Sequence, residues 1–477
     1  MNITEIAGPG AQASQILSLQ RAAFLHAGPP SLEQRRADLK KLRSAILERR
    51  GEIEAALNAD YGHRSRHETA IMETTPLILG IDYLCRNLRR FMRPTRRHVA
   101  MTFRFGSARV EYQPLGVVGI MAPWNYPLSL ALTPLATAMA AGNRAMIKPS
   151  EFTPATGDLL ASLLAQTFSR EQVAVVSGDA SIGAAFSALP FDHLLFTGST
   201  AVGRAVMRAA SDSLTPVTLE LGGKSPVIVD RGYPLERAAS GIAHGKLANE
   251  GQTCIAPDFA MVHEDDVGAF TSAYEQAVAR LYPTGPSSDD YSSIINDRHF
   301  DRLSGLIDDA RAKGARIVTV GRNPEDAARR ARTLAPMLLL GVNDGMRVMQ
   351  EEIFGPLLPV IAYRNLDEVI GYLNGRPRPL ALYYFGHDAG HRRQVLGRTT
   401  SGNVTINGTL LHYAQDDLPF GGIGASGMGA YHGIEGFRRL SHAKGIFLQG
   451  RWNGANLLRA PFGRLAEAIL DWMLRGR

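Results

Sequence analysis

The chain has 477 residues, of which 45% are hydrophobic and 20% charged, a composition typical of a globular protein with more than one domain. Its 52 basic and 45 acidic side chains give a net charge of +7, but the densest basic cluster, Arg89 to Arg97, lacks the interleaved aromatic residues of a nucleic-acid-binding module. We therefore expect no nucleic-acid partner. Two cysteines are too few for a disulfide framework, and neither a leader peptide nor a run of about 18 apolar residues is found, so we expect a cytoplasmic protein.

The first third of the chain predicts helices followed by a hairpin. Leu32, Leu39, Leu42, Ile46 and Ile53 recur at helical spacings, and the helical pattern extends over residues 31–91. Residues 98–113 then alternate apolar and polar side chains, which predicts an exposed antiparallel hairpin that projects from the body.

From Gly116 onward, short apolar runs alternate with helical segments, a pattern typical of βα units in a parallel sheet. The first series has predicted strands at 117–121, 145–147, 173–176 and 193–196, and the second has them at 227–229, 259–262, 317–320, 357–361, 380–385 and 404–406. Glycines interrupt the pattern at 220–224, where we place the boundary between two α/β domains. A ligand crevice is expected at the carboxyl ends of the strands.

Two groups of residues are candidates for binding a nucleotide. Residues 198–203, which include Gly198, Ser199 and Gly203, follow a predicted strand and open a helix, so their backbone N–H groups would face a pyrophosphate; the alternative is an ordinary capped helix. Lys148, at the end of another strand, is followed by Ser150 and Glu151, which would suit ribose hydroxyls or form a surface ion pair. The spacing Gly422-x-Gly424-x-x-Gly427 lacks a strand–turn–helix context and favours a glycine-rich turn.

Three residues in separate segments are candidates for acyl chemistry. Cys254 lies in a polar, glycine-bearing loop, where its thiolate would act as a nucleophile. Glu220 is flanked by leucines and glycines, which predicts a desolvated carboxylate with a raised pKa. Asn125 precedes a predicted helix and has an amide suited to stabilising an oxyanion. Each also has a purely structural interpretation, as does Cys85, which we interpret as a small buried hydrophobic residue.

Seven motifs occur in the order in which the aldehyde dehydrogenase superfamily has them. They are Ala-Pro-Trp-Asn-Tyr-Pro, Ala-Gly-Asn-Arg-Ala-Met-Ile-Lys-Pro-Ser-Glu, Phe-Thr-Gly-Ser-Thr, Leu-Glu-Leu-Gly-Gly-Lys-Ser-Pro, Gly-Gln-Thr-Cys, Glu-Glu-Ile-Phe-Gly-Pro and Pro-Phe-Gly-Gly. Residues 30–450 thus resemble that superfamily. The resemblance implies that Cys254 is the nucleophile, Glu220 the general base and Asn125 the oxyanion donor, with no metal. It places Trp124, Lys148, Ser150, Glu151, Gly198, Ser199, Gly203, Gly222, Glu352 and Phe354 at the cofactor.

The resemblance also implies a domain plan. We expect a Rossmann-like cofactor domain at 1–97 and 114–219 that includes the helical lead-in, a catalytic domain at 220–412, oligomerisation strands at 98–113 and 440–450, and an amphipathic tail at 451–477. The short N-terminus, the directness of the second half and the segment Gly-Met-Gly-Ala-Tyr-His-Gly look like the dimeric class 3 branch of the superfamily, which implies a homodimer. We expect the tail to dock on the chain's own body or on a partner subunit rather than on a membrane.

Two segments, Tyr61-Gly-His-Arg-Ser-Arg-His-Glu-Thr and Leu411-His-Tyr-Ala-Gln-Asp-Asp-Leu-Pro-Phe, are most similar to bacterial coniferyl aldehyde dehydrogenases. The expected substrate is therefore an aromatic aldehyde of that kind or a medium-chain aliphatic aldehyde, oxidised with NAD or, less favoured, NADP. The alternatives are a CoA-acylating aldehyde dehydrogenase, whose members generally lack the glutamate, and a catalytically silent structural protein of the same fold.

Overall fold

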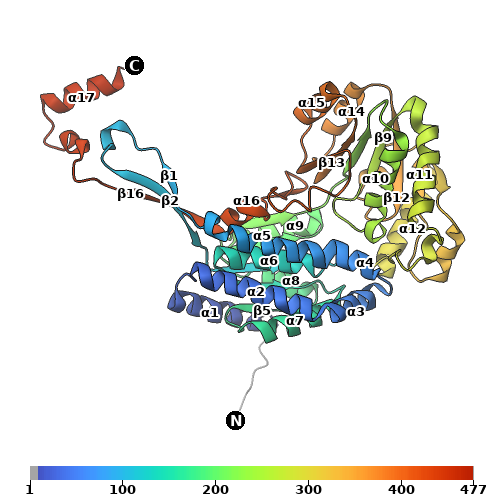
Figure 1. Ribbon diagram of the computed structural model, residues 1–477, viewed down its shortest axis with the longest axis horizontal. Coiled ribbons are helices and arrows are strands. Elements are labelled where there is room, and N and C mark those ends of the chain that lie inside the picture. The colour runs from blue at the N-terminus through green and yellow to red at the C-terminus, as the bar shows by residue number, and fades with distance from the viewer. Residues whose placement is uncertain (1–8, 476–477) are drawn as a thin grey trace, which may run out of the picture.

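The computed structural model describes residues 9–475, so the ends of the expected first domain and of the expected tail lie outside the described residues. Two large α/β domains lie side by side, and a small three-stranded sheet extends from the first of them (Figure 1). The predicted fold class of two α/β domains with a projecting β element is confirmed.

Helices form most of the N-terminal lead-in. They are α1 (Pro9–Ala27), α2 (Leu32–Glu48), α3 (Arg50–Tyr61), α4 (Arg66–Thr69), a π-helical turn (Ala70–Thr74) and α5 (Thr75–Phe91). The prediction that helices begin near residue 31 missed α1, although its buried side chains Ala13, Ile16, Leu17 and Gln20 follow a helical spacing.

The first domain is built on a six-stranded sheet with the order β15-β7-β6-β3-β4-β5. Its strands are β3 (Val117–Met121), β4 (Arg144–Lys148), β5 (Val173–Val175), β6 (His193–Thr197), β7 (Val217–Glu220) and the antiparallel edge strand β15 (Gly427–Met428). The helices between them are α6 (Ser129–Ala141), α7 (Pro154–Thr167), α8 (Ala180–Ser187) and α9 (Thr200–Ser211). The sequence analysis missed β7 and β15.

Both faces of this sheet are covered. Side chains of α2, α3, α5, α6 and α7 pack on one face with Val118 and Ile120, and side chains of α1, α8 and α9 pack on the other with Val117 and Met146. The strand order reverses between β3 and β6, and such a switch point is where open parallel sheets bind ligands.

The second domain has a seven-stranded sheet with the order β10-β11-β12-β9-β8-β13-β14. Its strands are β8 (Pro226–Val229), β9 (Phe259–His263), β10 (Arg316–Thr319), β11 (Met337–Leu340), β12 (Leu357–Tyr363), β13 (Ala381–Phe385) and β14 (Asn403–Ile406). The sequence analysis missed β11 and treated β10 as one of a parallel series, whereas β10 pairs antiparallel with β11 at the edge. The helices are α10 (Leu235–Leu247), α11 (Val267–Leu281), α12 (Asp297–Ala312), α13 (Arg347–Gln350), α14 (Leu366–Asn374) and α15 (Ala389–Arg398), with short 3₁₀ turns at Ala248–Gly251, Glu264–Asp266, Gly285–Ser287 and Pro324–Arg329.

The projecting sheet consists of β1 (Thr95–Arg97), β2 (Ser107–Pro114) and β16 (Ser441–Leu448), all antiparallel. The predicted first strand of the hairpin is therefore wrong, because residues 98–106 form a loop with a 3₁₀ turn at Met101–Phe103 and the strand lies before them. β16 follows α16 (Gly433–Arg439), which packs against α6.

The C-terminal tail ends in a 3₁₀ turn (Gly454–Leu458) and α17 (Arg464–Leu474), which project together with the three-stranded sheet (Figure 1). Leu465, Leu470, Trp472 and Leu474 are exposed on this helix. Docking of the tail on the chain's own large domains, one of the expected arrangements, is thus wrong for the described residues. A search of the same residues finds no helix with the length and apolarity needed to cross a membrane.

Candidate active site

The three acyl-chemistry candidates come from different parts of the fold and meet at the carboxyl edge of the first sheet. Asn125 lies in the loop after β3, Glu220 is the last residue of β7, and Cys254 lies in the second domain between the 3₁₀ turn Ala248–Gly251 and β9. Glu220 and Cys254 line two cavities, one on each side of them. The three residues are far apart in the sequence, so their proximity could not be predicted from it. It depends on the packing of the two domains.

The cavity on one side, which we call the glycine-lined cavity, has an empty volume of about 850 Å³. It is lined by Pro123, Trp124, Asn125, Thr197, Gly198, Ser199, Glu220, Leu221, Gly222, Cys254, His299, Arg302, Glu352 and Phe354. It contains the switch point between β3 and β6, so its position is the one expected for a nucleotide. Nine of the predicted cofactor and catalytic residues line it, and the fold brings them together from five separate segments of the chain.

The other cavity, which we call the aromatic cavity, is smaller, with an empty volume of about 490 Å³. Its lining is Met72, Tyr126, Ser129, Leu130, Thr197, Glu220, Leu221, Thr253, Cys254, Ile255, Leu380, Tyr413, Phe420 and Tyr431. Thr197, Glu220, Leu221 and Cys254 therefore form the wall that both cavities share. A group bound in one cavity would meet a group bound in the other at Cys254.

Glu220 is buried, with 3% of its surface exposed, and neither of its carboxyl oxygens has a hydrogen-bond partner. Burial raises the pKa of this carboxyl well above its usual range, as its leucine and glycine neighbours predicted. A carboxylate without partners retains all its acceptor capacity for a proton or a water molecule.

Cys254 is the second group in the shared wall, and its thiol is protonated in the free protein. Burial, together with the charges of Glu352 and Glu220, raises the pKa of Cys254 to about 12, against the opposite effect of the backbone N–H groups of Cys254 and Ile255. A thiol with this pKa is a weak nucleophile at neutral pH, because the thiolate is the reactive form. Activation of Cys254 therefore needs a base or a nearby positive charge.

Asn125 is held on both its main chain and its side chain. Its carbonyl accepts hydrogen bonds from the Tyr61 hydroxyl (2.7 Å) and from the Arg64 guanidinium (3.0 Å). Its side-chain Nδ2 donates one hydrogen bond to the carbonyl of Gln252 (3.1 Å), two residues before Cys254. An amide nitrogen carries two hydrogens, so the second remains for an oxygen at Cys254.

The rest of the lining of the glycine-lined cavity includes Gly222, Glu352 and a group of aromatic side chains. A Cβ on Gly222 would collide with the Glu352 carboxylate, so only glycine lets the chain pass this close to that group. Burial, followed by the charge of Asp258, raises the pKa of Glu352 to about 8. The ring of Trp124 lies 5.3 Å from Phe354 and 4.8 Å from His299. His299 and Arg302 were missed because no motif in the sequence marks them.

The lining of this cavity does not include four of the predicted cofactor residues, Lys148, Ser150, Glu151 and Gly203. Lys148 and Glu151 form an ion pair (2.7 Å) at the end of β4, and the Ser150 hydroxyl accepts a hydrogen bond from the amide of Phe152 (3.2 Å). Gly203, inside α9, faces Leu221, whose side chain leaves no room for a Cβ. Gly203 thus has a packing role that the phosphate interpretation did not anticipate.

The other sequence candidates lie elsewhere. Gly424 and Gly427 bridge each other in a tight turn that leads into β15, which confirms the glycine-rich turn and excludes a dinucleotide fingerprint there. Cys85 packs, partly buried, against the helices of the first domain.

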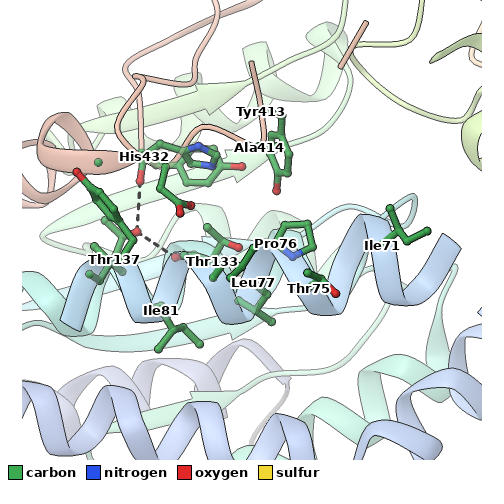
Figure 2. Close-up of a pocket in the computed structure, with 18 residues that line it drawn as sticks. Ile71, Thr75, Pro76, Leu77, Ile81, Thr133, Thr137, Tyr413, Ala414 and His432 are labelled. Atoms are coloured by element: carbon green, nitrogen blue, oxygen red, sulfur yellow. Dashed lines mark hydrogen bonds between the residues drawn. The ribbon is translucent and has the colours of Figure 1, made fainter. Parts of the chain in front are cut away.

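A third cavity, with an empty volume of about 820 Å³, lies outside the aromatic cavity and shares Tyr413 and Tyr431 with it. Figure 2 shows it between helix α5, which contributes Pro76, Leu77 and Ile81, and the segment that carries Tyr413 and His432. We call it the outer cavity. Its lining is mostly apolar, with hydroxyl groups of Thr75, Thr133 and Thr137 among the apolar side chains.

Comparisons with known proteins identify the class to which this fold and site belong. A model of the aldehyde dehydrogenase family matches residues 6–446. A probable coniferyl aldehyde dehydrogenase of Pseudomonas aeruginosa is 51% identical over 459 residues, covering 96% of this chain and 95% of that protein. The coniferyl aldehyde dehydrogenase of a Pseudomonas species is 46% identical over 479 residues, covering 99% of both chains.

Structural comparison gives the same class. The substrate-bound AldH of Staphylococcus aureus has a TM-score of 0.90 and 35% identity, covering 99% of this chain and 100% of its own. A Mycobacterium tuberculosis aldehyde dehydrogenase complexed with NAD+ has a TM-score of 0.84 and 27% identity, covering 93% and 91% of the two chains.

The protein is thus an NAD(P)-dependent oxidoreductase with two α/β domains. It belongs to the aldehyde dehydrogenase family, and its substrate is a small-molecule aldehyde. The resemblance found in its sequence motifs is confirmed.

Proposed function

We propose that the protein oxidises an aldehyde to the free carboxylic acid, with Cys254 as nucleophile, Asn125 as oxyanion donor and Glu220 as general base. The observation that carries the proposal is the unpaired, buried Glu220 carboxylate in the wall that Cys254 shares between the two cavities. A carboxylate kept without partners costs stability, so its retention at this point fits a role in proton transfer.

In the first half of the reaction the Cys254 sulfur attacks the aldehyde carbon from the shared wall, and a water molecule takes the thiol proton. The resulting oxyanion is held by the free Nδ2–H of Asn125 and by the backbone N–H of Cys254. When bound, NAD(P)+ supplies a positively charged ring that favours the thiolate and accepts the hydride. The glycine-lined cavity fits this group, because the segments that follow β3 and β6 line it at the switch point of the sheet and the aromatic side chains of Trp124 and Phe354 give it an apolar wall.

In the second half the thioester on Cys254 is hydrolysed. Glu220 accepts a proton from water, the hydroxide attacks the thioester carbon, and the acid leaves as the Cys254 thiol is restored. The alternative acceptor is CoA, for which a buried base at this wall is not required. The position of Glu220 beside Cys254 therefore favours water over CoA.

The substrate class follows from the cavities on the side away from the cofactor. Tyr126, Tyr413, Phe420 and Tyr431 line the aromatic cavity, and the outer cavity continues from Tyr413 and Tyr431 with hydroxyl groups in an apolar lining (Figure 2). This arrangement suits a ring conjugated to the aldehyde, with polar substituents at its far end. We infer an aromatic aldehyde of the coniferyl type, as in the similar Pseudomonas proteins, with medium-chain aliphatic aldehydes as the second candidate.

A substrate panel with product analysis tests this proposal. We expect kcat/KM for coniferyl-type aldehydes to exceed that for aliphatic aldehydes of similar size by at least about tenfold, and the product to be the free acid even with millimolar CoA present. Acyl-CoA formed faster than free acid would contradict the hydrolytic mechanism, and a preference for aliphatic aldehydes would support the second candidate substrate.

We further infer that NAD is preferred to NADP because Glu151 is expected beside the ribose. Burial acts to raise the pKa of Glu151, but the hydrogen bond and charge of Lys148 and the backbone N–H of Glu151 together outweigh it, so the pKa is lowered and the carboxylate is charged at neutral pH. This negative charge would repel the 2′-phosphate that NADP carries and NAD lacks. We expect Glu151→Gln to narrow the NAD:NADP ratio of kcat/KM by about tenfold, whereas Glu171→Gln, on the surface, leaves it unchanged. A higher kcat/KM with NADP in the unaltered protein would contradict the inference.

We infer that the protein is a cytoplasmic homodimer, assembled through the three-stranded sheet and the tail. The exposed apolar side chains of α17 need a surface to cover, and a partner subunit offers one. We expect the full chain to be dimeric by light scattering, a chain ending at Arg451 to dissociate more readily, and neither form to sediment with anionic liposomes. Sedimentation that depends on the tail and weakens with salt would instead assign α17 to a membrane surface.

A further inference from the structure

Arg64 and Glu73 form a buried ion pair beside the active site but outside the lining of the three cavities described above. Both side chains have 0% exposure, and Nη2 of Arg64 lies 3.5 Å from Oε1 of Glu73. A buried ion pair is usually worth little stability, because desolvation offsets the attraction between the charges. Its presence here calls for an explanation other than stability.

Arg64 contacts both loops that carry the proposed chemistry. Its Nη1 donates hydrogen bonds to the carbonyl of Asn125 (3.0 Å) and to the side-chain oxygen of Asn249 (3.0 Å). Its guanidinium lies over the rings of Tyr61 (4.6 Å) and Tyr126 (5.0 Å). The Tyr126 hydroxyl is in turn 2.6 Å from the Thr253 hydroxyl, next to Cys254.

The loop before Cys254 needs such support because its backbone is strained. Asn249 and Glu250 have φ values of 53° and 52°, a left-handed conformation that costs free energy in residues other than glycine. Glu68 accepts the backbone N–H of Asn249 (2.9 Å), and Arg64 holds its side chain. The turn is therefore fixed by side chains of the N-terminal helical segment.

The oxyanion donor Asn125 and the strained turn at Asn249 are linked because both donate hydrogen bonds to the same carbonyl oxygen. The side-chain amides of Asn125 (3.1 Å) and Asn249 (3.3 Å) both donate to the carbonyl of Gln252, two residues before Cys254. Arg64 donates hydrogen bonds to the same two residues, to the main-chain carbonyl of Asn125 and to the side-chain oxygen of Asn249. A movement of Arg64 would shift both amides relative to Cys254.

We propose that Arg64 is a positioning residue that fixes the distance between the Asn125 amide and the Cys254 sulfur by holding the loop after β3 and the turn before Cys254 together. The proposal rests on the roles proposed above for Cys254 and Asn125. Arg64 itself touches neither substrate nor cofactor. Its effect therefore falls on formation of the Cys254 adduct and on hydride transfer, not on cofactor binding.

Glu73 is the natural partner for a test, because it holds the far end of the same loop. Its Oε2 accepts the backbone N–H groups of Leu128 (2.9 Å) and Ser129 (3.0 Å), which a glutamine oxygen can also accept. Removing Arg64 alone would leave the Glu73 carboxylate buried and unpaired, which endangers folding. Arg64→Met is therefore made together with Glu73→Gln and compared with Glu73→Gln alone, in which Arg64 keeps its hydrogen bonds to Asn125 and Asn249 and its contacts with two tyrosine rings.

The experiment measures the rate of the first NADH equivalent, the NAD dissociation constant and Tm. We expect Arg64→Met/Glu73→Gln to form the first NADH on the order of tenfold or more slowly than Glu73→Gln, with NAD binding unchanged. Arg64→Lys keeps the charge beside Glu73 but is too short to reach both acceptors, so we expect a folded protein with a slowed burst. Arg66→Met, on the exposed side of the same segment, should leave the burst unchanged.

The Asn125→Ala background separates this proposal from the proposed function. If Arg64 acts by placing Asn125, adding Arg64→Met/Glu73→Gln to Asn125→Ala slows the burst by much less than it does when Asn125 is present. Full additivity, or bursts within about twofold of their references in both Arg64 variants, overturns the positioning role. A burst that survives Asn125→Ala unchanged instead overturns the proposed role of Asn125.

Discussion

Replacing Cys254 by alanine is expected to reduce steady-state NADH formation from any aldehyde to below about 1% of the unaltered rate, with NAD binding retained. Hydride leaves the substrate only from a tetrahedral adduct, and in the shared wall Cys254 supplies the nucleophilic atom for it. The neighbouring Glu220 does not replace the missing thiol, because in the proposed mechanism it accepts a proton and forms no bond to the aldehyde carbon. NAD titration by fluorescence and a steady-state assay measure the two quantities.

Cys85 provides the matched control, since it is the other cysteine of the chain, packs against the first domain and lines none of the three cavities. Burial raises the pKa of the Cys85 thiol, as it raises that of Cys254, but Cys85 lies outside both cavities that Glu220 lines. Cys85→Ala should keep full activity and lose about 1 kcal/mol of stability at most. Turnover above about 1% in Cys254→Ala, or its loss in Cys85→Ala, would place the nucleophile elsewhere.

The sequence predicted the chemical environment of single residues better than the way in which the fold brings these residues together. The leucines and glycines around Glu220 were enough to predict a desolvated carboxylate, because burial is a property of its immediate neighbours. The protonated state of the Cys254 thiol was not predicted. It arises partly from Glu352, which is about 100 residues distant along the chain and is brought close only by the fold.

The secondary structure was likewise predicted where neighbouring residues determine it and missed where they do not. The strands of the two sheet centres, such as β3 and β9, are continuous apolar runs and were predicted within a residue or two. β7 ends in the charged residue Glu220, and β15 has only two residues, so neither shows the continuous apolar run that marks the central strands. The contacts of Arg64 could not be predicted at all, since they join segments separated by 61 and 185 residues.

Replacing Glu220 by glutamine is expected to leave the first NADH equivalent in place but to slow steady turnover on the order of 10²-fold, as loss of a general base does. The thioester then accumulates on Cys254, because its formation needs the nucleophile and the oxyanion donor but its hydrolysis needs a base. Stopped-flow measurement of the burst, followed by mass spectrometry of the acylated protein, tests both parts. Added CoA should not restore turnover.

The pH dependence and stability of Glu220→Gln separate catalysis from structure. The pKa of Glu220 is raised in the folded protein, so hydrolysis in the unaltered enzyme should increase with pH as this group loses its proton, at a pH well above 4.5. The same shift means that the folded state holds the proton more tightly than the unfolded state, so stability falls as pH rises from about 4.5 to the folded pKa. Glutamine carries no charge, so the variant lacks both pH effects and should be at least as stable at neutral pH. A loss of the burst, a lower Tm or an unchanged pH profile would each show that Glu220 is structural and that another group deprotonates the water.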